Sequence, residues 1–144
     1  MTNFQTILVP VDFSDKSNRA ADFAAALAVE HRAKLYLLHV TDPIPNIGRI
    51  GAGFHEAVQQ SNIPEKLAKL SEIISEKIKA EISVEEIHIA GTPVHRVIVE
   101  KAGDLGVDVI VIPSPGPRGI GSFLKKNVAV LVMQQSPCHV LFVR

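Results

Sequence analysis

A short glycine-rich segment follows an apolar run in the last third of the chain. Residues 114–122 read SPGPRGIGS, and they lie between the β-branched run 107–112 and helical spacing of apolar residues from Phe123 to Gln134. A strand, a glycine-rich loop and a helix in this order can direct backbone N–H groups and a helix N-terminus toward an anion. The same residues also suit a plain connection, in which glycine allows turns and proline adds stiffness. Glycine spacing alone does not choose between these interpretations.

A carboxylate ends the first apolar run. Residues 6–12 read TILVPVD, so Asp12 is predicted at the carboxyl end of a buried strand, with Pro10 tolerated where the hydrogen-bond ladder stops. In an open parallel sheet, ligands bind at the carboxyl ends of the strands, where the winding reverses. Asp12 could accept hydrogen bonds from a ribose there, while N–H groups of the glycine-rich loop hold phosphates. The alternative for Asp12 is a helix cap or an Asx turn.

The remaining reactive side chains match no known catalytic or metal-binding pattern. Cys138 lies in an apolar stretch and is interpreted as a small buried hydrophobic residue. The six histidines lack the short spacing of a metal site; His39 and His139 are expected to be partly buried in strands, and the others at the surface. Without a G-x-S-x-G elbow or a Walker loop, we predict no catalytic and no metal-binding residues. A weak phosphatase or ATPase activity is the enzymatic alternative.

The composition is that of a globular protein of ordinary domain size. The 144 residues are 47% apolar and 21% charged, which suits one domain over 1–144 with a sizeable core. Fifteen basic and fifteen acidic residues cancel, which argues against a nucleic-acid partner. No apolar run approaches the roughly 18 residues of a membrane span, and signal-peptide features are missing. Together with a lone cysteine, which fits a reducing compartment, this predicts a cytoplasmic protein without a membrane partner.

Apolar runs alternate with helical periodicity along the chain. Residues 83–90 alternate most cleanly between apolar and polar, which indicates a sheet edge. Strands that alternate with helices predict an α/β fold of one doubly wound, mostly parallel sheet with helices on both faces. The predicted strands are 6–12, 34–40, 83–90, 107–112 and 139–143.

Capping residues and apolar spacing locate four helices. The first is expected from a cap at Ser14 or Asp15 to about His31, and its many alanines allow close approach to the sheet. A long connection is expected from Asn46 to Asn62. The other helices are predicted from Pro64 to about Ala80, from Pro93 with Thr92 as its cap, and from Phe123 to Gln134.

Six short motifs over nearly the whole chain carry a family resemblance. They are ILVPVDFS at 7–14, LLHV at 37–40, GTP at 91–93, VDVIV at 107–111, NVA at 127–129 and SPCHVLFV at 136–143. Together these motifs resemble the universal stress proteins. The resemblance implies a non-catalytic stress-response regulator with a five-stranded parallel sheet in order 3-2-1-4-5.

The resemblance also implies partners. Family members form homodimers, often by pairing the last strands of two chains, and the apolar run Val140–Val143 suits such an edge. Protein partners are a further implication.

Some members of the family hold ATP and others do not. In those that do, a carboxylate meets the ribose, backbone near the second strand meets the adenine, and a glycine-spaced loop holds the phosphates. Asp12 matches the carboxylate, Val40 the adenine-side backbone, and Gly116 with Gly119 the first half of the loop. The resemblance thus implies ATP or AMP, with or without Mg²⁺. The predicted nucleotide-binding residues are Pro10, Val11, Asp12, Val40, Ser114, Gly116, Gly119, Lys126, Asn127 and Val128.

The loop departs from the family pattern. Lys126–Asn127 stands where the family has a closing Gly-Ser, and the Gly121–Ser122 pair comes too early to replace it. Pro115 and Pro117 remove two N–H donors. Lys126 could place a charge on a phosphate, and the amide of Asn127 could donate a hydrogen bond. The alternative is a universal stress protein that binds no nucleotide and acts as a dimeric protein-interaction module.

Overall fold

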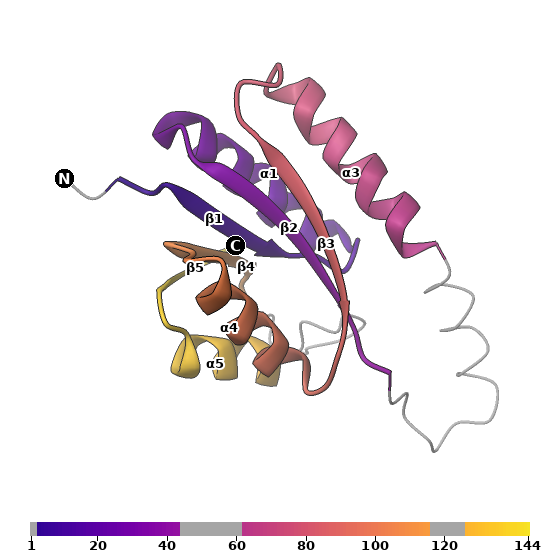
Figure 1. Ribbon diagram of the computed structural model, residues 1–144, viewed down its shortest axis with the longest axis vertical. Coiled ribbons are helices and arrows are strands. Elements are labelled where there is room, and N and C mark those ends of the chain that lie inside the picture. Colours follow the sequence, from indigo (N-terminus) through magenta and orange to yellow (C-terminus); the bar gives the residue numbers. More distant parts are fainter. Residues whose placement is uncertain (1–2, 44–61, 116–125) are drawn as a thin grey trace.

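The computed structural model describes residues 3–43, 62–115 and 126–144 (Figure 1). Most of the predicted connection 46–62 and the glycines at 116, 119 and 121 lie outside these residues. The described part forms a five-stranded sheet in which all neighbouring pairs are parallel. The strand order β3-β2-β1-β4-β5 confirms the expectation. The strands are β1 Thr6–Pro10, β2 Lys34–Thr41, β3 Val84–Ala90, β4 Val109–Pro113 and β5 His139–Val143.

Two pairs of helices cover the two faces of this sheet. Helices α1 (Asp15–His31) and α3 (Ile63–Lys77) lie on one face, and α4 (Val94–Asp104) and α5 (Lys126–Gln135) on the other (Figure 1). Each face has its own apolar core, so the doubly wound prediction is confirmed. None of the described helices is long and apolar enough to span a membrane.

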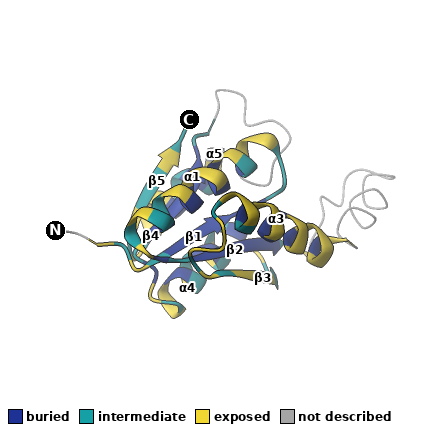
Figure 2. Cartoon of the chain, turned by 90° about the horizontal axis from the view of Figure 1, so that it is seen from above, coloured by how far each residue is buried: buried dark blue, intermediate teal, exposed yellow. Residues whose placement is uncertain are grey.

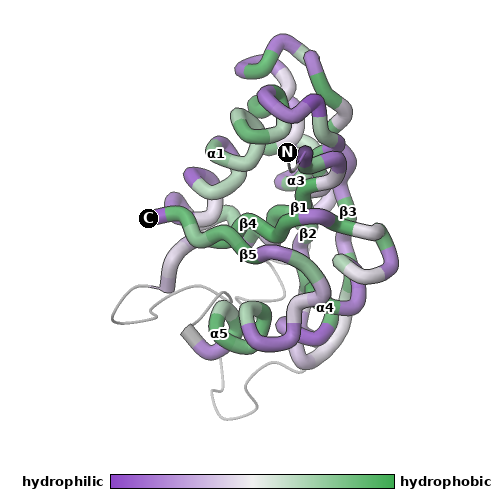
Figure 3. Tube along the Cα trace, turned by 90° about the vertical axis from the view of Figure 1, so that its left-hand side faces the viewer, coloured by the Kyte–Doolittle hydropathy of each residue, from purple (hydrophilic) through white to green (hydrophobic). Residues whose placement is uncertain are grey.

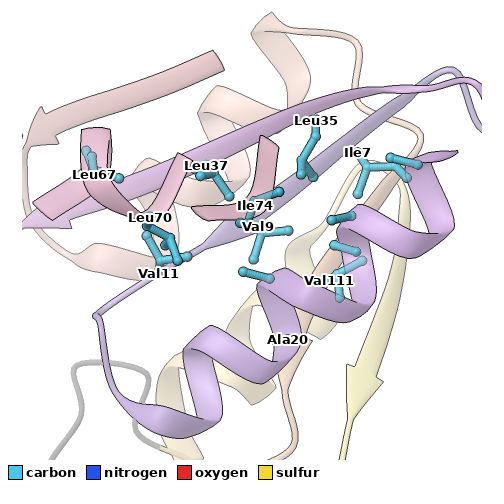
Figure 4. Close-up of a cluster of buried hydrophobic side chains, with 14 of the residues drawn as sticks. Ile7, Val9, Val11, Ala20, Leu35, Leu37, Leu67, Leu70, Ile74 and Val111 are labelled. Carbon is cyan, nitrogen blue, oxygen red and sulfur yellow. The ribbon is translucent and has the colours of Figure 1, made fainter. Parts of the chain in front are cut away.

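The side-chain alternation of the strands divides the core. Ile7, Val9 and Val11 point toward α1 and α3, where they meet Leu67 and Ile74 of α3 (Figure 4). The even-numbered Leu8, Leu38 and Ile110 belong to the core beneath α4 and α5. The central strands are dark blue in Figure 2, whereas β3 and β5 mix half-buried and exposed residues. Apolar residues on both faces therefore mark strands inside a parallel sheet, and alternation marks its edges.

Helix α1 approaches the sheet through alanines. Ala20, Ala21, Ala24 and Ala28 are completely buried, and Ala25 is nearly so. Because the side chain of alanine is a single methyl group, these residues let the backbone of α1 lie close to the strands. Ser14 is the N-cap, as expected, and its Oγ accepts a hydrogen bond from the Ser17 N–H at 3.2 Å.

Two predicted helix boundaries are wrong. Helix α3 ends at Lys77 rather than near Ala80, because Lys79 and Ala80 adopt φ values of 54° and 52°, outside the helical region. Helix α4 begins at Val94, since Pro93 is extended (φ −71°, ψ 152°) and occupies the N-cap position itself. Thr92 therefore lies one residue too early to cap the helix, and no side chain caps it.

Enlarging an alanine of this face tests the close packing. Ala24→Leu should lower the free energy of unfolding by about 1–3 kcal/mol, because the added carbons have no space between α1 and the sheet. Ala26→Leu makes the same change on the exposed side of the helix and should have little effect. Urea denaturation of both variants measures the difference. Equal stability of the two variants would show that the face is not close-packed.

Candidate functional site

The winding of the chain reverses between β1 and β4. The chain passes from β1 to β3 through helices on one face, and from β3 to β5 through helices on the other. The connections that leave the carboxyl ends of β1 and β4 therefore lead to helices on opposite faces of the sheet, and open parallel sheets bind ligands at such a point. The residues that follow these two strands, Asp12 and Ser114, are where a ligand of this fold is expected.

Asp12 is held in a tight turn. Its Oδ1 accepts hydrogen bonds from the Ser14 N–H at 2.9 Å and from the Ser14 hydroxyl at 2.6 Å. Its own N–H donates to Oγ of the completely buried Ser17 at 3.0 Å. The predicted Asx turn is therefore present. These hydrogen bonds fix the direction of the Asp12 carboxylate.

The ends of β1 and β2 lie side by side next to this turn. The Val11 N–H donates to the Leu38 carbonyl at 2.8 Å, and Pro10 ends β1 as a buried residue. Val40 is only 2% exposed and packs into the core beneath α4 and α5. Pro10, Val11 and Val40 therefore lie at neighbouring strand ends, and any contact of Val40 with a ligand involves its backbone.

The carboxyl end of β4 offers fewer backbone donors to a ligand than its sequence suggested. The Ser114 N–H donates to the Val143 carbonyl at 2.7 Å and so extends the pairing of β4 with β5. The Ser114 N–H is therefore used within the sheet and is not a donor for a ligand. Gly116 and Gly119 lie outside the described residues. Lys126, Asn127 and Val128 form the first turn of α5, where backbone N–H groups lack partners within the helix; Asn127 is exposed and Val128 half-buried.

Sequence reasoning missed the aromatic contact beside Asp12. Phe13 adopts φ 67°, and its ring stacks on His39 with centroids 5.2 Å apart. The Nδ1–H of His39 donates to the Val11 carbonyl at 2.8 Å, and Lys66 Nζ lies 5.7 Å from the Phe13 ring centroid. Burial lowers the pKa of His39 below its ordinary value, although the hydrogen bond to Val11 opposes this shift. A positive φ at phenylalanine leaves no signal in one sequence.

Three expectations on reactive side chains need correction. His139 is exposed rather than partly buried because β5 is an edge strand, and His31 and His95 are half-buried rather than at the surface. Cys138 is half-buried, and burial raises the pKa of its thiol. His39, which was also expected to be partly buried, is buried, with 8% of its surface exposed. In residues 3–43, 62–115 and 126–144, no three His, Cys, Asp or Glu side chains gather as a metal site requires.

Comparison with known proteins shows the family. The model of the universal stress protein family matches residues 3–144, and the chain therefore belongs to this family. It is 32% identical to universal stress protein YxiE of Bacillus subtilis, over 98% of this chain and 99% of that protein.

Solved structures of this family share the fold. A universal stress protein in complex with cAMP has a TM-score of 0.69 at 26% identity and covers 99% of this chain and 98% of its own. The universal stress protein of Archaeoglobus fulgidus in complex with dAMP has a TM-score of 0.65 at 26% identity and covers 99% and 100%.

Removing the capping hydroxyl tests the turn. Ser14→Ala should lower the free energy of unfolding by about 1 kcal/mol, because the Ser17 N–H loses its acceptor and Asp12 loses a hydroxyl donor. Ser14→Thr keeps the hydroxyl and serves as the matched control. Thermal denaturation of both variants measures the effect. An alanine variant as stable as the threonine variant would contradict the role of this hydroxyl.

Proposed function

We propose that the protein is a non-catalytic stress-response regulator, folded as one domain, that binds an adenine nucleotide at the carboxyl ends of β1, β2 and β4. The observation that carries this proposal is the oriented carboxylate of Asp12 beside the point where the winding reverses. The complexes of two relatives with cAMP and dAMP support an adenine nucleotide as the ligand class. The ligand in this chain is ATP or AMP, with Mg²⁺ as a companion of the phosphates.

Each part of the nucleotide has its own residues in this proposal. Asp12 accepts hydrogen bonds from the ribose hydroxyls. The backbone of Pro10, Val11 and Val40 borders the adenine. The Ser114 hydroxyl, Gly116 and Gly119 face the phosphates together with the first turn of α5, Lys126, Asn127 and Val128. A helix N-terminus favours anions because its N–H groups and its dipole both point toward them.

An Asp12 variant tests the ribose contact. Asp12→Asn keeps an oxygen for Ser14 and so preserves the turn, but hydrogen bonds to a neutral amide are weaker than those to a carboxylate. ATP and AMP affinity, measured by calorimetry, should fall roughly tenfold. Asp15→Asn removes the same charge three residues away, at an exposed position, and should bind as the unchanged protein does. Equal affinities of both variants would contradict the role of Asp12.

We also propose that the protein is a cytoplasmic homodimer paired through β5. This strand is a sheet edge whose backbone groups invite pairing with another strand. Leu141 and Val143 extend the core of the α1/α3 face, and Val140 that of the other face. Phe142 is 36% exposed and Met133 of α5 49%, and β5 is mainly green in Figure 3. A second copy would cover both faces of this edge. Without nucleotide, the same dimer would serve as a protein-interaction module.

A charge on this edge tests the dimer. Phe142→Lys should convert the dimer to a monomer in sedimentation equilibrium, because a buried ammonium at the pairing edge is costly. Ile73→Lys places the same charge on α3, at a residue that is 40% exposed, and should leave the dimer intact. A monomer before substitution, or a dimer that persists in the Phe142 variant, would contradict the proposal.

A further inference from the structure

Strand β3 forms the second edge of the sheet, at the opposite end from β5 (Figure 1). It pairs with β2 in one unbroken parallel register from Val84 to Ala90. Proteins often block an exposed edge with a proline or a β-bulge, and β3 contains neither. Among the described residues, no strand pairs with its outer side. The β3 edge is therefore regular over its whole length and open to a further strand.

The backbone groups of β3 point alternately toward β2 and away from the sheet. The Leu35 N–H donates to the Ser83 carbonyl, and the Gly91 N–H donates to the Thr41 carbonyl, both at 2.9 Å. Because the direction alternates along a strand, the odd-numbered residues between 83 and 91 also bond to β2. The even-numbered residues therefore direct their N–H and C=O groups outward, and they are Val84, Glu86, His88 and Ala90. All of them except the first are exposed.

The side chains of β3 give this edge one acidic and one partly apolar face. Ile87 and Ile89 are half-buried against the core beneath α4 and α5. Glu86 points to the opposite face, because side chains alternate along a strand. It is exposed and forms no ion pair with any residue that the structure describes. The carboxylate of Glu85, by contrast, is already paired with Lys34 Nζ at 2.7 Å.

The charges on β3 decide which kind of strand can pair with it. A second copy of β3 brings a second pair of glutamates to the same edge, and like charges across a strand pair are destabilising. The β5 edge differs, since residues 139–143 read HVLFV and contain no carboxylate, lysine or arginine. A strand with a basic residue beside Glu86 gains an ion pair, and β-branched residues beside Ile87 and Ile89 would cover their exposed parts. Charge complementarity therefore favours a basic partner strand over a second copy.

We propose that the β3 edge binds an extended segment of a partner protein in which basic residues alternate with β-branched apolar residues. The segment joins the sheet as a further strand, and its backbone pairs with the outward groups of the even-numbered residues of β3. Its basic side chains lie on the face of Glu86, and its apolar side chains on the face of Ile87 and Ile89. This edge is separate from the carboxyl ends of β1, β2 and β4 and from β5. The interaction therefore requires neither nucleotide nor the homodimer.

A peptide as long as β3 tests this edge in the nucleotide-free protein. The probe has seven residues of alternating lysine and valine, with blocked ends, and is added to isotope-labelled protein. NMR resonances of amides 84–90 should shift, and the outward amides should become protected from hydrogen exchange. The same peptide N-methylated at every residue keeps its side chains but has no backbone donors, so its affinity should be at least roughly tenfold lower. Equal affinities of the two peptides, or shifts at β5 in place of β3, would overturn the proposal.

A charge exchange tests the acidic face of the edge. Glu86→Lys should weaken binding of the lysine–valine peptide roughly fivefold or more, and it should allow binding of a glutamate–valine peptide, because the ion pair is reversed. Glu72→Lys makes the same change of net charge at an exposed position of α3 and should leave both affinities unchanged. Equal losses in the two variants would contradict the proposal. Protection of the outward amides without peptide, increasing with protein concentration, would assign the edge to a second copy and contradict it as well.

Discussion

The hydrogen bonds among Asp12, Ser14 and Ser17 are the interaction on which the candidate site depends. They cap α1, and they fix the carboxylate at the carboxyl end of the central strand. A helix start needs acceptors for its unpaired N–H groups, and a ligand site needs an oriented carboxylate. The turn from Asp12 to Ser17 supplies acceptors for the start of α1 and also orients the carboxylate. The two interpretations of Asp12, as a local turn and as a ligand-binding residue, are therefore compatible, because the turn is what sets the direction of the carboxylate.

The position of this turn follows from the burial of β1. Ile7, Leu8 and Val9 are completely buried because helices cover both faces of the central strand. Helices can cover both faces only if the chain reverses its winding, and it does so beside β1, next to Asp12. The narrow alanine face of α1 brings the helix close to the sheet. The burial of β1, the winding of the chain and the position of Asp12 are therefore linked, and the same topology leaves β5 as an edge of the sheet.

The sequence predicted the fold well because its signals are local. Apolar runs gave the strands, and a capping serine gave the start of α1. The errors have long-range or conformational causes: Pro93 takes the cap position expected for Thr92, and His139 is exposed because its strand is an edge. The stack of Phe13 on His39 joins residues 26 positions apart through a positive φ, which sequence periodicity does not reveal. The donation of the Ser114 N–H to β5 likewise appears only in the folded chain.

The most direct measurement of the central claim is the nucleotide content of the protein as purified. The chain has no tryptophan and one tyrosine, so its own ultraviolet absorbance is weak and bound adenine is easily seen. The protein would be purified without added nucleotide and denatured, and the released fraction would be analysed by absorbance and chromatography. We expect nearly one adenine nucleotide per chain. No released nucleotide, together with an unchanged melting temperature in the presence of Mg-ATP or AMP, would contradict the account and favour a protein-interaction module.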